Sequence, residues 1–188
     1  MKNKGNNPSL TRWSFRLWRN GHLVFSSWFV PNQNVDEGAI FLLDTIMQTA
    51  VNYNAAWFAG LCVGAVSASV QDTAAKITTA TPNPPTTNDW QEFTAYQEAT
   101  RQPVGWQPAS TDPFVLPSNW KAGKQSNLIS FTMNAAATIG GGFLVDVAAK
   151  GSTMGHLYCV DNGAGSLAVL PGDVVQVGIL TGFRQGPV

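Results

Sequence analysis

Charged residues, histidines and cysteines are scarce in this sequence, and each scarcity narrows the possible functions. Only 12% of the 188 residues are charged, against roughly 25% in a typical globular domain. A surface so poor in charge is either neutral polar or covered by a partner. The one close pair of potential metal ligands is His156 and Cys159, whose three-residue spacing on a strand would point the side chains to opposite faces. We therefore expect neither a metal site nor a cofactor.

Long apolar runs and catalytic motifs are also missing. Residues 45–71 lack charge but are interrupted by amide side chains, so they predict no membrane span. The sequence shows no secretory-signal pattern, no nucleophile elbow and no nucleotide-binding glycine loop. Cys62 and Cys159 lie in apolar runs, which indicates buried thiols rather than a disulfide. These features predict a soluble protein that is made in a cytoplasm.

Glycine and tryptophan, by contrast, are frequent, with 18 and 7 residues. They accompany short strand patterns separated by turn residues, as is typical of β-sandwiches and jelly rolls. The predicted strands are two within residues 11–30 and others within 55–66, 90–97, 127–134, 137–148, 153–161, 166–170 and 173–183. The stretch IGGGF at residues 139–143 predicts a bulge or a close backbone approach in a sheet. The predicted fold is mainly β: a β-sandwich or jelly-roll-like domain with one short α-helix and an N-terminal β-hairpin arm.

One segment has the pattern of an α-helix. Asn34 is a suitable N-cap, Glu37 follows three residues later, and apolar residues then recur at helical spacing. This pattern predicts a helix near residues 35–48. Residues 67–88 form a polar stretch rich in proline and threonine, and a loop of that length is usually functional or disordered.

Residues 1–30 are predicted to form a basic, aromatic arm, separate from a β-sandwich domain over residues 31–188. Five lysines and arginines precede the first acidic residue, Asp36. Asn20 and Gly21 suit a type I′ turn, because both central positions of that turn need positive φ. The residues predicted to bind a partner are Arg12, Trp13, Phe15, Arg16, Leu17, Trp18, Arg19, Phe25, Trp28 and Phe29. The alternative is a solvated strand face with a frayed terminus; five basic residues on one arm do not make a nucleic-acid-binding groove.

The stretch DWQEFTAYQEATRQPVGWQPAS concentrates acidic and aromatic side chains. Glu92 and Glu98 would share a strand face, but six residues at about 3.3 Å each separate them by roughly 20 Å. Glycosidase carboxylate pairs need roughly 5–9.5 Å, so we expect no enzyme. Trp90, Trp106 and Trp120 could stack on sugar rings, although strand tryptophans more often pack in cores.

A series of motifs follows in a familiar order along the chain: NVDEGAIFLLDTI, WFAGLCVG, DTAA, WQEFTAYQEATRQPVGW, NLISFTM, ATIGGGFLV, GHLYCV and PGDVVQV. This order resembles a family of small structural proteins, of the decoration or cement type, in the virions of tailed bacteriophages. The likeness runs from about Asn34 to Leu180 and leaves out the arm. QSN also stands where the family usually has Asn-Ser before the central strand. The resemblance implies a β-sandwich protein on a capsid, tail or fibre and implies no catalytic residue.

The resemblance also implies an architectural role for the WQEFTAYQEATR motif. We expect Trp90, Phe93 and Tyr96 to be core and cross-strand residues. We expect Arg101 to pair with a nearby acid, and at a surface such a pair contributes only about 0–1 kcal/mol.

A capsid decoration or cement protein is the favoured function. Low charge suits large permanent interfaces, whose centres exclude charged residues, and an arm can add strands to the sheet edge of a neighbouring subunit. The expected partners are major capsid protein subunits and further copies of the chain, with a trimer favoured. The expected location is the virion, assembled in the host cytoplasm, with no membrane and no nucleic-acid contact. The alternative is a tail or fibre component that recognises host glycans through residues 67–88, and a polysaccharide hydrolase is the least favoured class.

Overall fold

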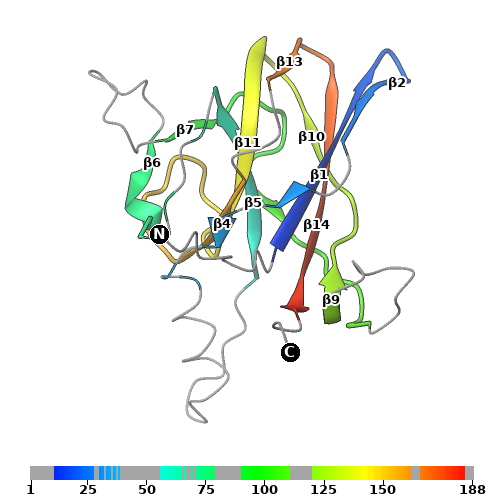
Figure 1. The fold of residues 1–188 in the computed structure, drawn as a ribbon. Coiled ribbons are helices and arrows are strands. Elements are labelled where there is room, and N and C mark those ends of the chain that lie inside the picture. The colour runs from blue at the N-terminus through cyan, green and yellow to red at the C-terminus, as the bar shows by residue number, and fades with distance from the viewer. Residues whose placement is uncertain are drawn as a thin grey trace, which may run out of the picture.

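The structure, a computed structural model, describes residues 11–27, 30, 31, 33, 34, 36, 38, 56–64, 66, 69, 71–78, 90–110, 120–161 and 166–184. This part of the chain is mainly β and has almost no helix. Its strands form two sheets, which stand next to each other in Figure 1. The coarse prediction of a mainly β protein is therefore confirmed.

The first sheet has six strands: β1 (Thr11–Arg19), β2 (His22–Ser26), β3 (Val30–Pro31), β9 (Trp120–Gln125), β10 (Ile129–Thr132) and β14 (Val174–Arg184). Their order is β10-β14-β1-β2, with β3 beside β1 and β9 beside β14. β1 and β14 are antiparallel neighbours from Thr11 opposite Thr181 to Trp18 opposite Val174. Two strands from opposite ends of the sequence thus form the centre of this sheet.

The second sheet has eight strands: β4 (Gln33–Asn34), β5 (Phe58–Val63), β6 (Ile77–Thr78), β7 (Trp90–Phe93), β8 (Gln102–Pro103), β11 (Ala137–Val145), β12 (Leu157–Val160) and β13 (Leu167–Val169). Their order is β4-β12-β11-β5-β7-β6, with β13 beside β11 and β8 beside β5. All pairs in it are antiparallel except β6 with β7.

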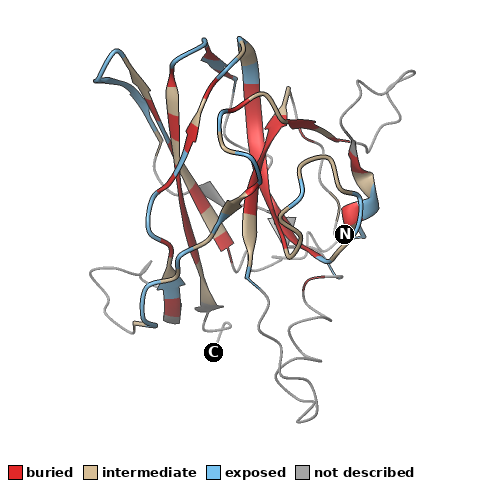
Figure 2. Cartoon of the chain, turned by 180° about the vertical axis from the view of Figure 1, so that it is seen from behind, coloured by how far each residue is buried: buried red, intermediate tan, exposed pale blue. Residues whose placement is uncertain are grey.

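Both sheets contribute to one hydrophobic core, and the buried positions follow the facing strands in Figure 2. Trp13 and Phe15 of β1 and Val177 of β14 are fully buried in the same cluster as Leu61 of β5 and Leu144 of β11. In β1 every second residue faces this core, as the alternation of apolar and polar residues predicts.

The eight-stranded sheet is buried on both faces. Cys62 and Phe143 pack away from the shared core, with Ile77 and Trp90, in a second hydrophobic cluster. The short 3-10 helix η1 (Ala74–Lys76) adds an alanine to this cluster. Two buried faces explain why residues 139–145 of β11 and all of β12 lack polar alternation.

Residues 11–19 do not behave as part of a separate arm. They form β1, an inner strand of the six-stranded sheet that is hydrogen-bonded to β14 on one side and to β2 and β3 on the other. Asn20 and Gly21, which connect β1 to β2, have φ values of 50° and 77°, as a type I′ turn requires. The local turn prediction agrees with the structure, whereas the prediction that this segment stands apart from the domain needs correction.

Two further predictions concern the segments between strands. The helix predicted near residues 35–48 lies largely outside the described residues; within it only Asp36 and Gly38 are described, both with helical backbone. The loop predicted over residues 67–88 contains η1 and β6 at residues 74–78, so that part of it belongs to the domain.

The IGGGF stretch has both features that its glycines predict. The register between β11 and β5 shifts between Ile139 and Gly141, which is a bulge. A Cβ atom at Gly142 would lie 2.6 Å from Cζ3 of Trp13. Glycine at this position therefore lets the indole of β1 pack directly on the backbone of β11 and joins the two sheets closely.

Candidate functional site

Three of the predicted partner-binding residues belong to the core. Trp13 and Phe15 are fully buried, and Leu17 is 3% exposed, all within the cluster shared by the two sheets. Side chains without accessible surface cannot contact a partner in the folded protein. The prediction that they anchor a partner is therefore wrong, and their role is to hold β1 in the domain.

Trp18 and Arg19, two further predicted partner-binding residues, form hydrogen bonds to β14 and to the turn before it. Trp18 donates its indole N–H to Oε1 of Gln176 at 2.9 Å. Arg19 donates from Nε to Oδ1 of Asp173 at 3.0 Å and from Nη2 to Oδ2 at 2.7 Å. The hydrogen bond from Arg19 lowers the pKa of Asp173, against the opposing effect of burial, and the backbone N–H of Leu170 lowers it further. Arg19 thus fastens β1 to the turn before β14.

The remaining predicted residues differ in position. Arg12 is partly buried, Arg16 and Phe25 are exposed, and Trp28 and Phe29 lie outside the described residues. Of the ten predicted residues, the structure therefore leaves Arg16 and Phe25 exposed, on opposite faces of the sheet, because Arg16 lies opposite Ser26 and Phe25 lies opposite the buried Leu17.

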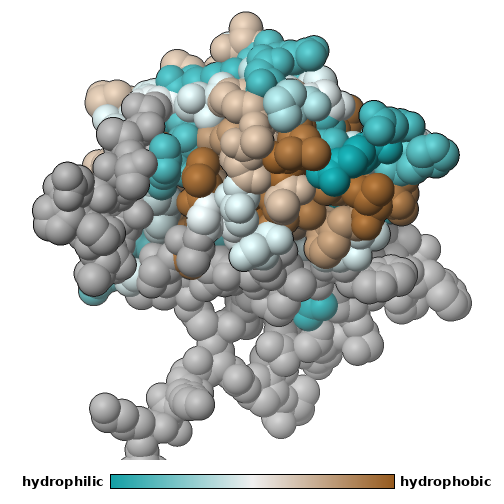
Figure 3. Space-filling view, turned by 90° about the horizontal axis from the view of Figure 1, so that it is seen from above, coloured by the Kyte–Doolittle hydropathy of each residue, from teal (hydrophilic) through white to brown (hydrophobic). Residues whose placement is uncertain are grey.

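Strand β2 is the most exposed strand edge that the structure describes. All five of its residues are exposed, and Leu23, Val24 and Phe25 have 48%, 52% and 37% of their surface accessible. On its outer side no further strand pairs with β2 within the described residues. Figure 3 shows apolar side chains among polar ones at the end of the molecule that carries the β1–β2 turn.

The pairing of β2 is not regular. The register with β1 shifts between Leu17 and Trp18, because Phe25 lies opposite Leu17 and Leu23 opposite Trp18, with Val24 as the extra residue. Such a bulge twists an edge and interrupts its row of free backbone groups. The edge is therefore suited to contacts through its side chains more than to the addition of a long regular strand.

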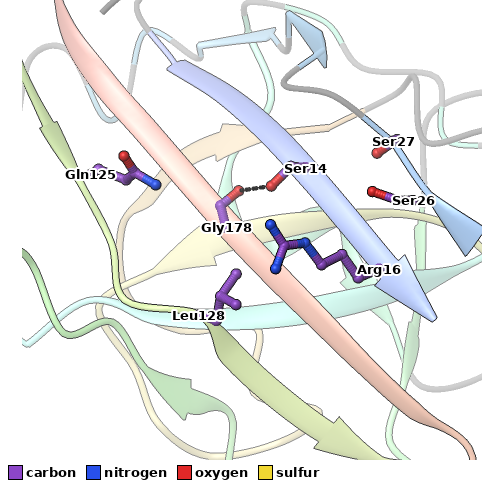
Figure 4. Close-up of a pocket in the computed structure, with 7 residues that line it drawn as sticks. All are labelled: Ser14, Arg16, Ser26, Ser27, Gln125, Leu128 and Gly178. Atoms are coloured by element: carbon purple, nitrogen blue, oxygen red, sulfur yellow. Dashed lines mark hydrogen bonds between the residues drawn. The ribbon is translucent and has the colours of Figure 1, made fainter. Parts of the chain in front are cut away.

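A groove of about 140 Å³ lies beside this edge, on the outer face of the six-stranded sheet. Figure 4 shows the Arg16 side chain reaching from β1 across β14, among residues that line the groove: Ser14, Ser26, Ser27, Gln125, Leu128 and Gly178. The Ser14 hydroxyl donates to the Gly178 carbonyl, and the Ser27 hydroxyl accepts from the N–H of Phe15. No acidic residue lines the groove, and Arg16 has no ion pair among the described residues. Its guanidinium can receive an acidic group.

A second hollow, of about 280 Å³, lies where the two sheets meet at one end. We call it the aromatic pocket; it is lined by Trp57, Trp106, Lys124, Leu144, Tyr158 and Thr181. The rings of Trp57 and Tyr158 are in contact, with centroids 5.3 Å apart. The Tyr158 hydroxyl lies 3.0 Å from the Thr181 hydroxyl. Sequence reasoning selected only Trp106 of these residues, because the others come from distant segments that carry no common motif.

The acidic residues of the WQEFTAYQEATR motif have structural partners. Glu92 forms a buried ion pair with Arg101, and the Glu98 carboxylate accepts hydrogen bonds from the N–H and hydroxyl of Thr132. The expected pairing of Arg101 with an acid is confirmed, but its expected surface location is wrong. Trp90, Phe93 and Tyr96 are 3%, 5% and 3% exposed, so their prediction as core residues is confirmed.

Sites of other kinds are limited in the described part of the chain. No group of three or more histidine, cysteine, aspartate or glutamate side chains there could hold a metal ion. Nor is any described helix long and apolar enough to cross a membrane. Comparison with protein-family models, curated protein sequences and solved structures gave no match.

Proposed function

We propose that this protein is a structural component of a tailed-bacteriophage virion, a decoration protein that binds major capsid protein subunits and stabilises the head. The proposed fold is a β-sandwich of the jelly-roll type, and the proposed assembly is a homo-oligomer, with a trimer favoured. The motif order and the low charge support the proposal. The observation that carries it is the β2 edge, where three consecutive apolar residues, Leu23, Val24 and Phe25, are exposed.

The Arg16 groove extends this docking surface. Ser26 lies at the end of β2 and lines the groove together with Arg16, and Leu23 lies opposite Trp18 on the same outer face of the sheet, so the groove borders the exposed strand. A capsid segment with apolar side chains and one acidic side chain would match both parts. Such a match gives specificity and orientation more than affinity.

The size of this surface favours binding by several copies at once. Complete burial of a leucine, valine or phenylalanine contributes about 1.5–3 kcal/mol relative to full exposure. Because about half of each β2 side chain is already covered, the three together contribute roughly 3 kcal/mol. That corresponds to a dissociation constant weaker than about 1 mM for one copy. An oligomer that engages several capsid subunits would raise the apparent affinity without any new contact, which is why the proposal includes self-association.

The test is binding of the purified protein to capsids stripped of accessory proteins. We expect saturable binding that raises the melting temperature of the capsid, and we expect Val24→Asp to weaken binding by at least about tenfold, since it places a charge in an apolar contact. The matched control is Met154→Asp, which changes an equally apolar side chain, 72% exposed, outside β2. Deletion of residues 1–30 is not usable, because it would remove β1 from the centre of the sheet.

Two outcomes would reject the proposal. One is that the wild-type protein does not bind capsids at all. The other is that Val24→Asp and Met154→Asp bind as the wild type does, which would mean that the β2 edge is not the docking surface. The proposal includes no catalytic activity and no cofactor.

A second candidate function is a tail or fibre component that recognises the host surface. The aromatic pocket favours it, because partly exposed tryptophan rings beside polar groups can bind sugars. Binding to host cell surfaces without binding to capsids would support this candidate over a decoration protein.

A further inference from the structure

We propose that the aromatic pocket binds a saccharide, and specifically a pyranose ring that carries a carboxylate. Trp57, Trp106 and Tyr158 give the pocket flat apolar faces, and Lys124 places a cation at its rim. This inference goes beyond the proposed function and does not rest on it, since the pocket is formed within one chain whether or not β2 meets a capsid.

The tryptophans of the pocket are held by backbone contacts on both sides. The N–H of Val104 donates to the carbonyl of Trp57 at 2.8 Å, and Trp106 forms an isolated bridge with Ser126. The next residue, Gln107, donates its N–H to a carbonyl of β9 at 2.8 Å. These contacts fix the backbone at both tryptophans, and the ring of Trp57 also packs on that of Tyr158, which reduces the conformational freedom that a ligand would have to restrict.

Trp57 and Trp106 are more exposed than the two tryptophans that lie within the core clusters. Trp13 and Trp90 are 0% and 3% exposed, whereas Trp57 and Trp106 are only partly buried at the margin of the core. Both indoles line the hollow with part of their surface accessible, so they can contact a ligand there. The C–H face of a sugar ring is apolar and flat enough to cover such a ring.

The polar groups of the pocket fit the remaining parts of such a ligand. The hydroxyls of Tyr158 and Thr181 lie 3.0 Å apart, and the Thr181 hydroxyl also lies 3.3 Å from that of Thr11. Since each hydroxyl has two lone pairs, the Tyr158 oxygen can still accept a hydrogen bond from a sugar hydroxyl. Lys124 is exposed and has no ion pair among the described residues, so its ammonium can pair with a carboxylate on the ring. The volume of about 280 Å³ is at or below the lower limit of roughly 300 Å³ for drug-sized ligands, so it suits a single ring.

The experiment follows the indole N–H signals of the nitrogen-15-labelled full chain by NMR during titration. The ligands are methyl glucuronide, methyl glucoside, which lacks the carboxylate, and sodium acetate, which lacks the ring. We expect the glucuronide to shift two indole signals with a millimolar dissociation constant, as the small size of the ligand allows. The glucoside should bind about threefold more weakly, and acetate should cause no shift.

Three variants assign the binding to the pocket. Trp106→Ala should weaken glucuronide binding by about tenfold or more through the loss of one stacking face. Lys124→Gln should abolish the preference for the glucuronide over the glucoside. Trp18→Ala, which removes a partly exposed indole from the outer face of the six-stranded sheet, is the matched control and should bind as the wild type does.

The results that overturn the inference are equally specific. Absence of any indole shift up to about 20 mM glucuronide, roughly ten times the expected dissociation constant, would reject a sugar site. Equal shifts with acetate would show an adventitious anion effect at lysines, and an unchanged preference in Lys124→Gln would reject the acidic specificity. Because Lys124 is exposed, that last variant stays informative even if Trp106→Ala does not fold. Sugar binding together with failure to bind capsids would separate this inference from the proposed function.

Discussion

Arg101 and Glu92 form a two-point ion pair in the interior of the protein. Nε of Arg101 donates to Oε1 of Glu92 at 2.9 Å and Nη2 donates to Oε2 at 2.8 Å, and both side chains are fully buried. Arg101 also donates to the carbonyls of Val147 and Ser152, and Glu92 accepts from the N–H of Gly151 at 2.7 Å. The pair therefore holds the loop after β11 against β7.

The first prediction concerns the loss of one partner of this pair. Arg101→Met leaves the Glu92 carboxylate buried without its cation, and breaking a buried pair in this way costs about 3–5 kcal/mol. We expect the free energy of unfolding in urea to fall by that amount. The double variant Arg101→Met/Glu92→Gln removes the uncompensated charge and should recover part of the loss. A loss below about 1 kcal/mol for Arg101→Met, the level of a surface pair, would contradict the prediction.

The second prediction concerns pH and the Arg19–Asp173 pair. The pKa of Asp173 is lower in the folded protein than in the unfolded chain, chiefly through the hydrogen bond from Arg19. Folding therefore favours the ionised carboxyl, and this stabilisation is complete above the unfolded pKa of about 3.9 and is lost as pH falls through the lower folded value. Asp173→Asn should thus lose less stability than the wild type between about pH 5 and pH 3.

Urea midpoints measured across this pH range test the prediction. The matched control is Asp36→Asn, which removes an exposed carboxyl that has no ion pair among the described residues. Parallel profiles for the wild type and Asp173→Asn would show that the pair with Arg19 does not stabilise the fold.

The sequence predicted local features well where one segment carries the signal. The sequence predicted two strands within residues 11–30, where β1 and β2 lie, and Asn20-Gly21 identified the turn between them. Neither pattern shows that β1 pairs with β14 from the other end of the chain. A local pattern fixes which face of a strand is apolar but not which strand lies beside it, so an inner strand was interpreted as an arm.

The features that sequence reasoning missed depend on distant segments. Strand β9 contains lysines and a glycine and shows no apolar alternation. It is a strand through its pairing with β14, and its own sequence gives no signal of that pairing. The pairing of Arg101 with an acid was expected, but not its complete burial, because arginine and glutamate are rarely fully buried. The aromatic pocket joins Trp57, Trp106 and Tyr158 from three separate segments. In the sequence, nothing distinguishes each of these residues from an aromatic residue that packs in the core.

The third prediction concerns the contact of Gly142 with β1. In Gly142→Ala the new methyl group would lie 2.6 Å from Cζ3 of Trp13 and 3.0 Å from the carbonyl oxygen of Gly60. Trp13 is fully buried and cannot move aside, so we expect a loss of about 1–3 kcal/mol, as for an overpacked core.

The control for that variant is Gly105→Ala, measured by the same urea denaturation. Its methyl group would meet Nδ2 of Asn127 at 3.1 Å, the end of an exposed side chain that can rotate away. We expect a change within about 0.5 kcal/mol. Equal losses in the two variants would mean that the close packing of Trp13 on β11 does not limit stability.

The fourth prediction concerns the two thiols. Cys62 and Cys159 form no disulfide with each other and are both fully buried. Burial raises the pKa of Cys62, and Glu92 and Asp161 act in the same direction. Since the thiolate is the reactive form, both should react with an aromatic disulfide reagent only as fast as the protein unfolds. Met154→Cys, at a position 72% exposed, should add one thiol that reacts at once. Rapid reaction of either native thiol in the folded protein would show that the core around β5 or β12 opens without global unfolding.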